Sequence, residues 1–116
     1  MSDCVFCKIV NKEIPAQIVY EDEEIMAFKD IHPLAPIHIL FIPKKHISDI
    51  SQIQSDDAGL IGRIHIAAVQ VARELGIESN GFRLVNNCRS HGGQEVYHLH
   101  FHLLGGRKLG AFVGQG

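Results

Sequence analysis

The amino-acid sequence predicts a single α+β domain in which a mostly antiparallel five-stranded sheet packs with two helices. The chain has 116 residues and no internal repeat or linker, so residues 1–116 are expected to form one domain with a sizeable core. Only one long helical segment, at about residues 56–75, lies between predicted strands, whereas parallel strands need a crossover between each pair. The strands are predicted from short apolar and β-branched runs, which are Ile18–Glu21, Ile25–Phe28, Ile37–Pro43, Phe82–Asn86 and Val96–Leu104.

The N-terminal segment predicts a short helix from about Cys4 to Lys12. Asp3 is the expected capping residue, and Pro15 ends the helical pattern because proline lacks a backbone N–H. Apolar residues four positions apart would press one side of this helix onto the core; these pairs are Val5 with Ile9 and Phe6 with Val10.

The middle of the chain predicts a hairpin, a loop and the long helix. The acidic run at residues 21–24 is the expected hairpin turn, and the two prolines of Asp30–Pro36 predict a loop. Ser55-Asp56-Asp57 is typical of a helix start, and the helix should run to about Leu75 and stop at Gly76. Ile66 and Val69 lie off its main apolar stripe, which favours a second packing partner such as another subunit.

The C-terminal third predicts two strands separated by a polar loop. This loop is expected at Asn87–Gln94, and Gly105-Gly106 should end the last strand.

Composition excludes several classes of protein. The formal net charge is −2. The sequence shows no basic face of the kind that a nucleic-acid-binding protein usually has. The longest apolar runs, Ile37–Pro43 and Ile64–Ala72, are far shorter than the roughly 18 residues of a membrane span. The sequence does not open on a basic and apolar leader, and its three cysteines are an odd number that suits no disulfide framework. We therefore expect a cytoplasmic protein with reduced thiols.

Three of the eight histidines alternate with apolar residues in the last predicted strand. His98, His100 and His102 should share one face, spaced roughly 6.5 Å apart, and Leu99, Phe101 and Leu103 should share the other. Such a row of imidazoles favours metal ligation, proton transfer or nucleophilic attack. His32, His65 and His91 are single histidines, which are more often ordinary surface or core residues.

Cys4 and Cys7 are three residues apart at a predicted helix start, so their thiols lie on one face and suit a tetrahedral zinc ion. A redox pair or a chance spacing would also account for them. A redox pair normally follows a strand, and no strand is predicted before Cys4. Two further ligands are needed for zinc, and histidine is the abundant candidate. Cys88 is left over and is expected to be free.

The segment His98-Leu99-His100-Phe101-His102, followed by two apolar residues, resembles the signature of the histidine-triad superfamily of nucleotide hydrolases and transferases. Further segments are similar to the Hint branch of small nucleoside phosphoramidases: Phe28–Ile31, Ala35–His38, Ile42–Ser48, Gly92–Gln94 and Gly105–Arg107. The resemblance covers nearly the whole chain. It implies a histidine-triad fold and a homodimer in which the two sheets become continuous.

The resemblance also implies the roles of individual residues. His100 matches the nucleophile that attacks the α-phosphorus and forms a nucleotidyl-histidine, and the His98 carbonyl would hold its other ring nitrogen. Positions that line the phosphate site match His38, Asn87, His102 and the stretch Gly93, Gln94, Glu95 and Val96. Asp30 matches the acceptor of the ribose hydroxyls. The base pocket matches apolar residues that are also ordinary core candidates, namely Val5, Phe6, Phe28 and Ile31.

Two departures from the eukaryotic pattern concern the leaving group. Glu95 stands where those proteins have a serine, so its role is left open: it donates a proton, repels phosphate or turns away. The chain also lacks their tryptophan-bearing tail.

The resemblance extends to a metal site. In zinc-containing triad proteins and the related galactose-1-phosphate uridylyltransferases, two histidines complete such a cysteine pair, and these match His46 and His98. Four protein ligands, Cys4, Cys7, His46 and His98, would make the zinc structural rather than catalytic.

The leading functional hypothesis is a hydrolase of purine nucleoside phosphoramidates, such as AMP linked to an amine, acting through a nucleotidyl-His100 intermediate. A second hypothesis is a dinucleoside-polyphosphate hydrolase of the same superfamily, although that branch usually has glutamine in place of the third histidine, here His102. A third is a nucleotide-binding regulatory protein with incidental turnover, and a fourth is a catalytic metalloenzyme.

Overall fold

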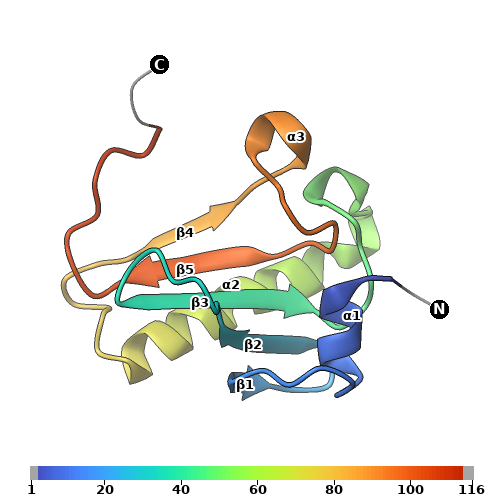
Figure 1. The fold of residues 1–116 in the computed structure, drawn as a ribbon, viewed down its shortest axis with the longest axis horizontal. Coiled ribbons are helices and arrows are strands. Elements are labelled where there is room, and N and C mark those ends of the chain that lie inside the picture. Colours follow the sequence, from blue (N-terminus) through green and yellow to red (C-terminus); the bar gives the residue numbers. More distant parts are fainter. Residues whose placement is uncertain (1–2, 114–116) are drawn as a thin grey trace.

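The computed structural model describes residues 3–113 as a central antiparallel sheet with helices on both faces (Figure 1). The sheet order is β1-β2-β3-β5-β4, and every neighbouring pair is antiparallel. The strands are β1 (Ile18–Glu21), β2 (Ile25–Lys29), β3 (Ile37–Pro43), β4 (Arg83–Asn86) and β5 (Phe101–Gly105). The helices are α1 (Val5–Val10), α2 (Ala58–Glu74) and α3 (Arg89–Gly92), with 3₁₀ turns at Ile50–Gln52 and Ser55–Asp57. The expected α+β fold class is confirmed.

The two faces of the sheet bury separate apolar clusters. The long helix α2 crosses one face (Figure 1) and packs Ile64, Ala68 and Val71 against alternate residues of the strands, such as Phe41 and Leu103. The short helix α1 covers only part of the other face, where Phe6 and Ile9 pack on residues of β2 and β3 that include Phe28 and Leu40. The rest of that second face is therefore available for polar side chains.

The histidines lie on the face that α1 leaves partly open. In the β3–β5 ladder, His38 pairs with Leu104, and Leu40 pairs with His102. Because side chains alternate along a strand, these two diagonal histidines point to the same side of the sheet. The register of the β3–β5 pair thus fixes the relative position of these imidazoles.

The last strand differs from its predicted extent of Val96–Leu104. The regular strand begins only at Phe101, because the Leu99 N–H donates to Ile47 O at 2.6 Å and residues 96–98 bend away from the ladder. The predicted division of faces nevertheless holds: Leu99, Phe101 and Leu103 belong to the α2 cluster, while His98 and His100 both contact the Phe6 ring on the α1 side.

Three further local predictions need correction. Asp3 does not cap α1: Cys4 is the N-cap and its thiol accepts the Cys7 N–H at 3.3 Å. The segment expected as a loop at residues 87–94 contains α3, which ends at Gly93 with a φ of 81°. The 3₁₀ turn at Ser55–Asp57 precedes α2, and Asp57 accepts the Gln54 N–H at 2.8 Å. Side-chain capping at the first and last of these sites overrides the simple sequence signal.

Among residues 3–113, no helix is both long enough and apolar enough to cross a membrane.

Gly106, in the turn after β5, combines a left-handed backbone with close contacts. Gly106 has a φ of 95°, and a Cβ there would lie 2.9 Å from Pro36 Cβ. We expect Gly106→Ala to lower the free energy of unfolding by about 1–3 kcal/mol, because it adds both backbone strain and a clash.

Gly62→Ala is the matched control for this test. Gly62 lies on the exposed side of α2 with nothing within 4 Å of a new Cβ, so this variant should gain about 0.5–1 kcal/mol. Urea unfolding followed by circular dichroism measures both changes. Equal stabilities for the two variants would contradict the role assigned to this turn.

Candidate active site and candidate metal centre

His100 is oriented by two hydrogen bonds to the backbone around it. Its Nδ1–H donates to His98 O at 2.7 Å, as the family resemblance implied, and Asn86 Nδ2 donates to His100 O at 2.9 Å. Because a carbonyl only accepts, the proton of the neutral ring is on Nδ1 and the lone pair is on Nε2.

Nε2 of His100 reaches the surface. Within residues 3–113, every fully buried side-chain nitrogen or oxygen atom has a hydrogen-bond partner, and Nε2 of His100 has none among these residues. The residue is 6% exposed and its ring packs edge-on against Phe6, with the ring centroids 5.2 Å apart. The arrangement therefore aims one unprotonated nitrogen outward from a buried ring.

Burial lowers the pKa of His100 below the ordinary histidine value. The His98 carbonyl and the charges of Asp30 and Glu95 oppose this shift and only reduce it. His100 is consequently neutral at pH 7, which is the state required of an imidazole nucleophile.

His38 and His102 form a hydrogen-bonded chain beside His100. The Leu34 N–H donates to His38 Nδ1 at 3.1 Å, so the proton of neutral His38 is on Nε2. That Nε2 lies 2.9 Å from His102 Nδ1 and 3.5 Å from Asp30 Oδ2. His102 Nδ1 therefore accepts, and the proton of His102 is on its own Nε2.

The chain makes His102 a neutral donor next to the nucleophile. Burial is the main cause that lowers the pKa of His102 to about 4, with further contributions from His100 and His38. Burial also lowers the pKa of His38. The His100 and His102 rings are 5.0 Å apart, centroid to centroid, so a group bound between them meets a lone pair on one side and an N–H on the other.

The loop after α3 supplies backbone donors. Gln94 is buried and its side-chain amide is fully used: Oε1 accepts the Arg89 N–H at 2.8 Å, and Nε2 donates to Ser48 O and Val96 O. The N–H groups of Glu95 and Val96 have no acceptor in the described part of the chain. Two consecutive free N–H groups suit an anion such as phosphate.

A cavity of about 440 Å³ extends from His102 and Asn87 toward Leu34 and Phe112. Among the predicted base-contacting residues, Phe6 and Phe28 are buried against each other, whereas Val5 and Ile31 are 39% and 85% exposed. Asp30 borders a second cavity of about 590 Å³ together with Ile31. Asn87 and His102 thus border one cavity and Asp30 and Ile31 another, whereas Phe6 and Phe28 belong to the apolar cluster under α1.

Four predicted metal ligands meet at the start of α1. One ligand atom from each of Cys4, Cys7, His46 and His98 lies within 4.8 Å of all the others. His98 Nδ1 is 3.3 Å from Cys4 Sγ and 3.2 Å from His46 Nδ1, and Cys7 Sγ is 3.3 Å from His46 Nδ1. His98 Nε2–H donates to Pro43 O at 2.7 Å, which leaves a lone pair on Nδ1.

The donor set fits a metal ion such as zinc. Two sulfur and two nitrogen atoms are a common tetrahedral set, and a ligating histidine usually gives its other N–H to a carbonyl, as His98 does to Pro43. Burial lowers the pKa of His98 to about 4, so the ring is neutral, as a ligand must be.

Asp30, His38 and His102 also bring ligand atoms within 4.8 Å of one another. Here the backbone works against a metal: the Leu34 N–H occupies the Nδ1 lone pair of His38 and leaves a proton on Nε2. This cluster is therefore a hydrogen-bond chain, whereas the cysteine cluster gathers lone pairs and thiols.

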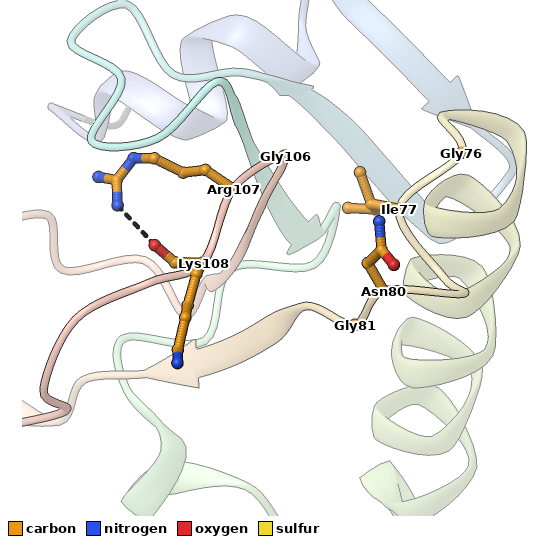
Figure 2. A pocket seen from close by; sticks show the side chains of 7 residues that line it. All are labelled: Gly76, Ile77, Asn80, Gly81, Gly106, Arg107 and Lys108. Atoms are coloured by element: carbon orange, nitrogen blue, oxygen red, sulfur yellow. Dashed lines mark hydrogen bonds between the residues drawn. The ribbon is translucent and has the colours of Figure 1, made fainter.

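A further cavity of about 500 Å³ lies between the C-terminal end of α2 and the turn after β5 (Figure 2). It is lined by Gly76, Ile77, Asn80, Gly81, Gly106, Arg107 and Lys108. The Arg107 guanidinium donates to Lys108 O and Leu34 O. Without a histidine, thiol or carboxylate in its lining, this cavity offers no chemistry comparable to the histidine face.

Three groups that orient the site could not be identified from the sequence. They are the Asn86 amide, the Leu34 N–H and the Pro43 carbonyl. The last two are backbone groups with no side-chain signal, and Asn86 is indistinguishable in sequence from a residue that ends a strand. His32, His65 and His91 are exposed, in agreement with their interpretation as ordinary residues.

An antiparallel sheet that carries histidines in this arrangement is shared with a known family of proteins. Residues 3–114 match the family described as "Scavenger mRNA decapping enzyme C-term binding", and solved structures with the same fold are named as HIT family and histidine-triad proteins. The chain belongs to the histidine-triad family.

Individual relatives are similar along almost the whole chain. A purine nucleoside phosphoramidase of Escherichia coli K12 is 46% identical over 111 residues, which are 96% of this chain and 93% of that protein. The crystal structure of a HIT family hydrolase from Legionella pneumophila has a TM-score of 0.94 and 52% identity, covering 97% of this chain and 100% of that one. A histidine triad protein from Clostridium difficile has a TM-score of 0.93 and 47% identity, covering 97% of each chain.

The lowered pKa of His102 predicts how stability depends on pH. Between about 6.5, its value in an unfolded chain, and about 4, the unfolded chain binds a proton at His102 that the folded protein does not. The free energy of unfolding should therefore fall as the pH is lowered through this range, by at most about 1.4 kcal/mol per pH unit for this group.

His102→Asn should show a weaker dependence in urea unfolding at pH 7, 6 and 5. Because the variant keeps Cys4, Cys7, His46 and His98, any loss of a bound metal in acid is common to both proteins. The same slope in wild type and variant would contradict the prediction.

Proposed function

We propose that this protein hydrolyses purine nucleoside phosphoramidates, releasing an amine and a purine nucleoside monophosphate through a covalent nucleotidyl-His100 intermediate. The observation that carries the proposal is the geometry of His100, whose Nδ1–H is bonded to His98 O while its Nε2 lone pair reaches the surface. The name of the Escherichia coli relative, purine nucleoside phosphoramidase, supports the same class of substrate, and the Legionella relative is a hydrolase of the same family.

The reaction is proposed to proceed by two displacements. In the first, His100 Nε2 forms a bond to the α-phosphorus, the P–N bond to the amine breaks, and the amine leaves with the electron pair and takes up a proton. In the second, water attacks the phosphorus and releases a proton to the solvent, the bond to Nε2 breaks, and its electron pair returns to the ring. The His98 carbonyl stabilises the imidazolium that forms while phosphorus is attached.

The surrounding groups are proposed to bind the charged phosphate. His102 Nε2–H donates to one oxygen, and the free N–H groups of Glu95 and Val96 with the Asn87 amide hold others. His38 keeps His102 in its donor form, and Gly93 and Gln94 shape the turn.

The nucleoside is proposed to lie on the opposite side of the phosphate from the cavity of about 440 Å³. Asp30 accepts the ribose hydroxyls, and Val5, Phe6, Phe28 and Ile31 form an apolar surface for the purine. Dinucleoside polyphosphates are the second candidate substrate, and the presence of His102 favours the phosphoramidate, because the branch that hydrolyses dinucleoside polyphosphates usually has glutamine there.

We also propose that Cys4, Cys7, His46 and His98 hold a structural zinc ion. Bound there, the metal would supply a tetrahedral link between α1 and the segment that carries His100, and with four protein ligands it would have no open position. A catalytic metal at Asp30, His38 and His102 is disfavoured by the proton on His38 Nε2. Cysteine thiolates as ligands imply a reducing compartment, and we propose the cytoplasm.

A homodimer is proposed on two features. Strand β4 is an edge of the sheet, with one side unpaired within residues 3–113, and Ile66 on the outer side of α2 is 69% exposed. A second copy would cover both if its own β4 lay alongside, and the two sheets would then be continuous.

Replacing His100 tests the proposed function. Wild-type protein incubated with an adenosine 5′-phosphoramidate should release the amine, and His100→Ala should lower kcat by at least about 10³-fold because the nucleophile is lost. His65→Ala, which changes an exposed histidine of α2, is the matched control and should keep wild-type activity. No release by wild type, or equal release by His100→Ala, would exclude the proposal, and equal nucleotide binding without turnover would favour a regulatory protein.

Zinc content tests the metal proposal. Protein purified without a histidine tag should contain about one equivalent of zinc by elemental analysis, and Cys7→Ser should lose most of it and unfold at a lower temperature. Cys88→Ser is the control, because Cys88 lies outside the cluster. Less than a few tenths of an equivalent in wild type, or unchanged zinc in Cys7→Ser, would contradict the site.

A further inference from the structure

Arg89, the first residue of α3, has an unusual backbone conformation. Its φ is 59°, and the only other non-glycine residue with positive φ in residues 3–113 is Lys12. Side chains with a Cβ rarely adopt this left-handed region, so a residue held there needs compensating contacts. The contacts of Arg89 are therefore informative about the loop that follows it.

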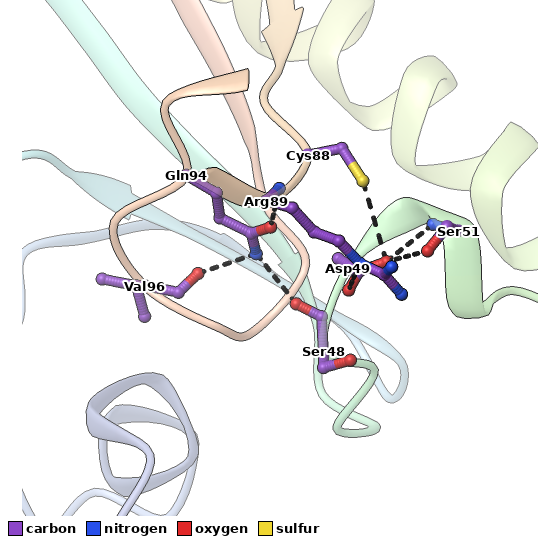
Figure 3. Close-up of polar contacts among 7 residues, drawn as sticks. All are labelled: Ser48, Asp49, Ser51, Cys88, Arg89, Gln94 and Val96. Carbon is purple, nitrogen blue, oxygen red and sulfur yellow. Dashed lines mark hydrogen bonds and ion pairs between the residues drawn. The ribbon is translucent and has the colours of Figure 1, made fainter. Parts of the chain in front are cut away.

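Hydrogen bonds to Gln94 and Asp49 hold Arg89 in place, and Figure 3 shows those to the Gln94 side chain and to Asp49. Its N–H donates to Gln94 Oε1 at 2.8 Å, and its carbonyl accepts the Gln94 N–H at 3.0 Å. The guanidinium Nε donates to Asp49 Oδ2 at 3.0 Å. The backbone of Arg89 thus turns the chain toward Gln94, while its side chain reaches back to a different segment.

Asp49 is a firm anchor for this arginine. The residue is only 3% exposed, and its carboxylate accepts the Ser51 N–H at 2.9 Å, the Ser51 hydroxyl and the Cys88 thiol at 3.8 Å in addition to Arg89. The Ser51 hydrogen bonds and the Arg89 charge lower the pKa of Asp49. The carboxylate is consequently ionised throughout the neutral range.

A second link runs beside the ion pair. Gln94 Nε2 donates to Ser48 O at 2.8 Å and to Val96 O at 3.0 Å (Figure 3). Residues 48–49 are therefore joined to the 89–96 loop at two points. Glu95 and Val96 follow Gln94 directly in the chain. Their backbone N–H groups have no acceptor among the described residues.

We propose that Asp49 and Arg89 are positioning residues for phosphate binding: their ion pair fixes the 89–96 loop so that the Glu95 and Val96 N–H groups point together at the phosphate of the substrate. This inference rests on the proposed function, because it takes the loop to be the phosphate site. A displacement of the donors by about 1 Å weakens a charge-assisted hydrogen bond substantially.

The test compares a ligand that has the phosphate with one that lacks it. Calorimetric Kd values for AMP and for adenosine are measured with wild type, Asp49→Asn, Arg89→Ala and the double variant. We expect Kd for AMP to rise roughly tenfold in each single variant and not to rise further in the double variant, because both changes break one link. Kd for adenosine should stay within twofold of wild type, a selectivity that general loosening of the fold would not produce.

Two further variants separate the ion pair from the backbone. Arg89→Lys keeps the positive charge and should retain most of the AMP affinity that Arg89→Ala loses. Arg89→Gly relieves the left-handed strain, so it should fold at least as well as Arg89→Ala. Arg89→Gly should nevertheless bind AMP weakly, because it lacks the ion pair. Arg73→Ala removes an exposed ion pair with Glu78, 2.7 Å long, at the C-terminal end of α2, and should change neither Kd.

An AMP Kd within twofold of wild type in Arg89→Gly, or equal losses for AMP and adenosine, would overturn the positioning role. The outcome is separable from that of the proposed function. Wild type that binds AMP but releases no amine would refute the hydrolase while the AMP comparison still decides the role of Asp49 and Arg89. If wild type hydrolyses the substrate through His100 but its AMP affinity does not change when Arg89 is replaced, only the positioning role is refuted. If wild type binds no AMP, both the proposed function and the positioning role are overturned.

Discussion

Three imidazoles on the open sheet face, those of His38, His98 and His100, each have their tautomer fixed by one backbone group, and the chemistry of the site depends on this constraint. The Pro43 carbonyl accepts a hydrogen bond from His98 Nε2–H, so the lone pair of His98, on Nδ1, faces the cysteines. The His98 carbonyl accepts a hydrogen bond from His100 Nδ1–H, so the lone pair of His100, on Nε2, faces outward. The Leu34 N–H instead donates to His38 Nδ1, so the proton of His38 is on Nε2, which donates to His102. His38 in turn fixes the tautomer of His102, whereas an imidazole with no fixed hydrogen-bond partner exchanges between its two tautomers.

Burial is the second requirement, and the two apolar clusters provide it. The pKa values of His100, His102 and His98 are all lowered chiefly by burial, so the rings stay neutral near pH 7. Phe6 of α1 contributes directly, since its ring lies edge-on to His98 and His100 at 6.0 and 5.2 Å. A short helix thus excludes water from the rings and also carries Cys7, one of the candidate metal ligands, which explains why α1 matters beyond its six residues.

The sheet, the long helix and the shared face of the three triad histidines could be predicted from periodicity, whereas the other residues of the site were predicted from the resemblance to the histidine-triad family. The tautomers could not be predicted, since Pro43 O and the Leu34 N–H belong to segments far from the triad and leave no trace in residue type. The early part of the predicted last strand was wrong for a related reason: Ile47 O captures the Leu99 N–H. The short helix at Arg89 escaped prediction because a left-handed arginine depends on the distant Asp49.

The segment at residues 46–49 joins the candidate metal centre to the candidate phosphate loop. His46 is a candidate ligand, Ile47 O accepts from Leu99 within the triad segment, Ser48 O accepts from Gln94, and Asp49 pairs with Arg89. Four consecutive residues therefore contact three parts of the site, namely the candidate metal centre, the triad segment and the 89–96 loop. Because a tetrapeptide has few soft torsions once each residue is bonded, fixing His46 to a metal restrains the other three. A closed metal site placed here would steady the phosphate donors and the nucleophile together, without touching substrate.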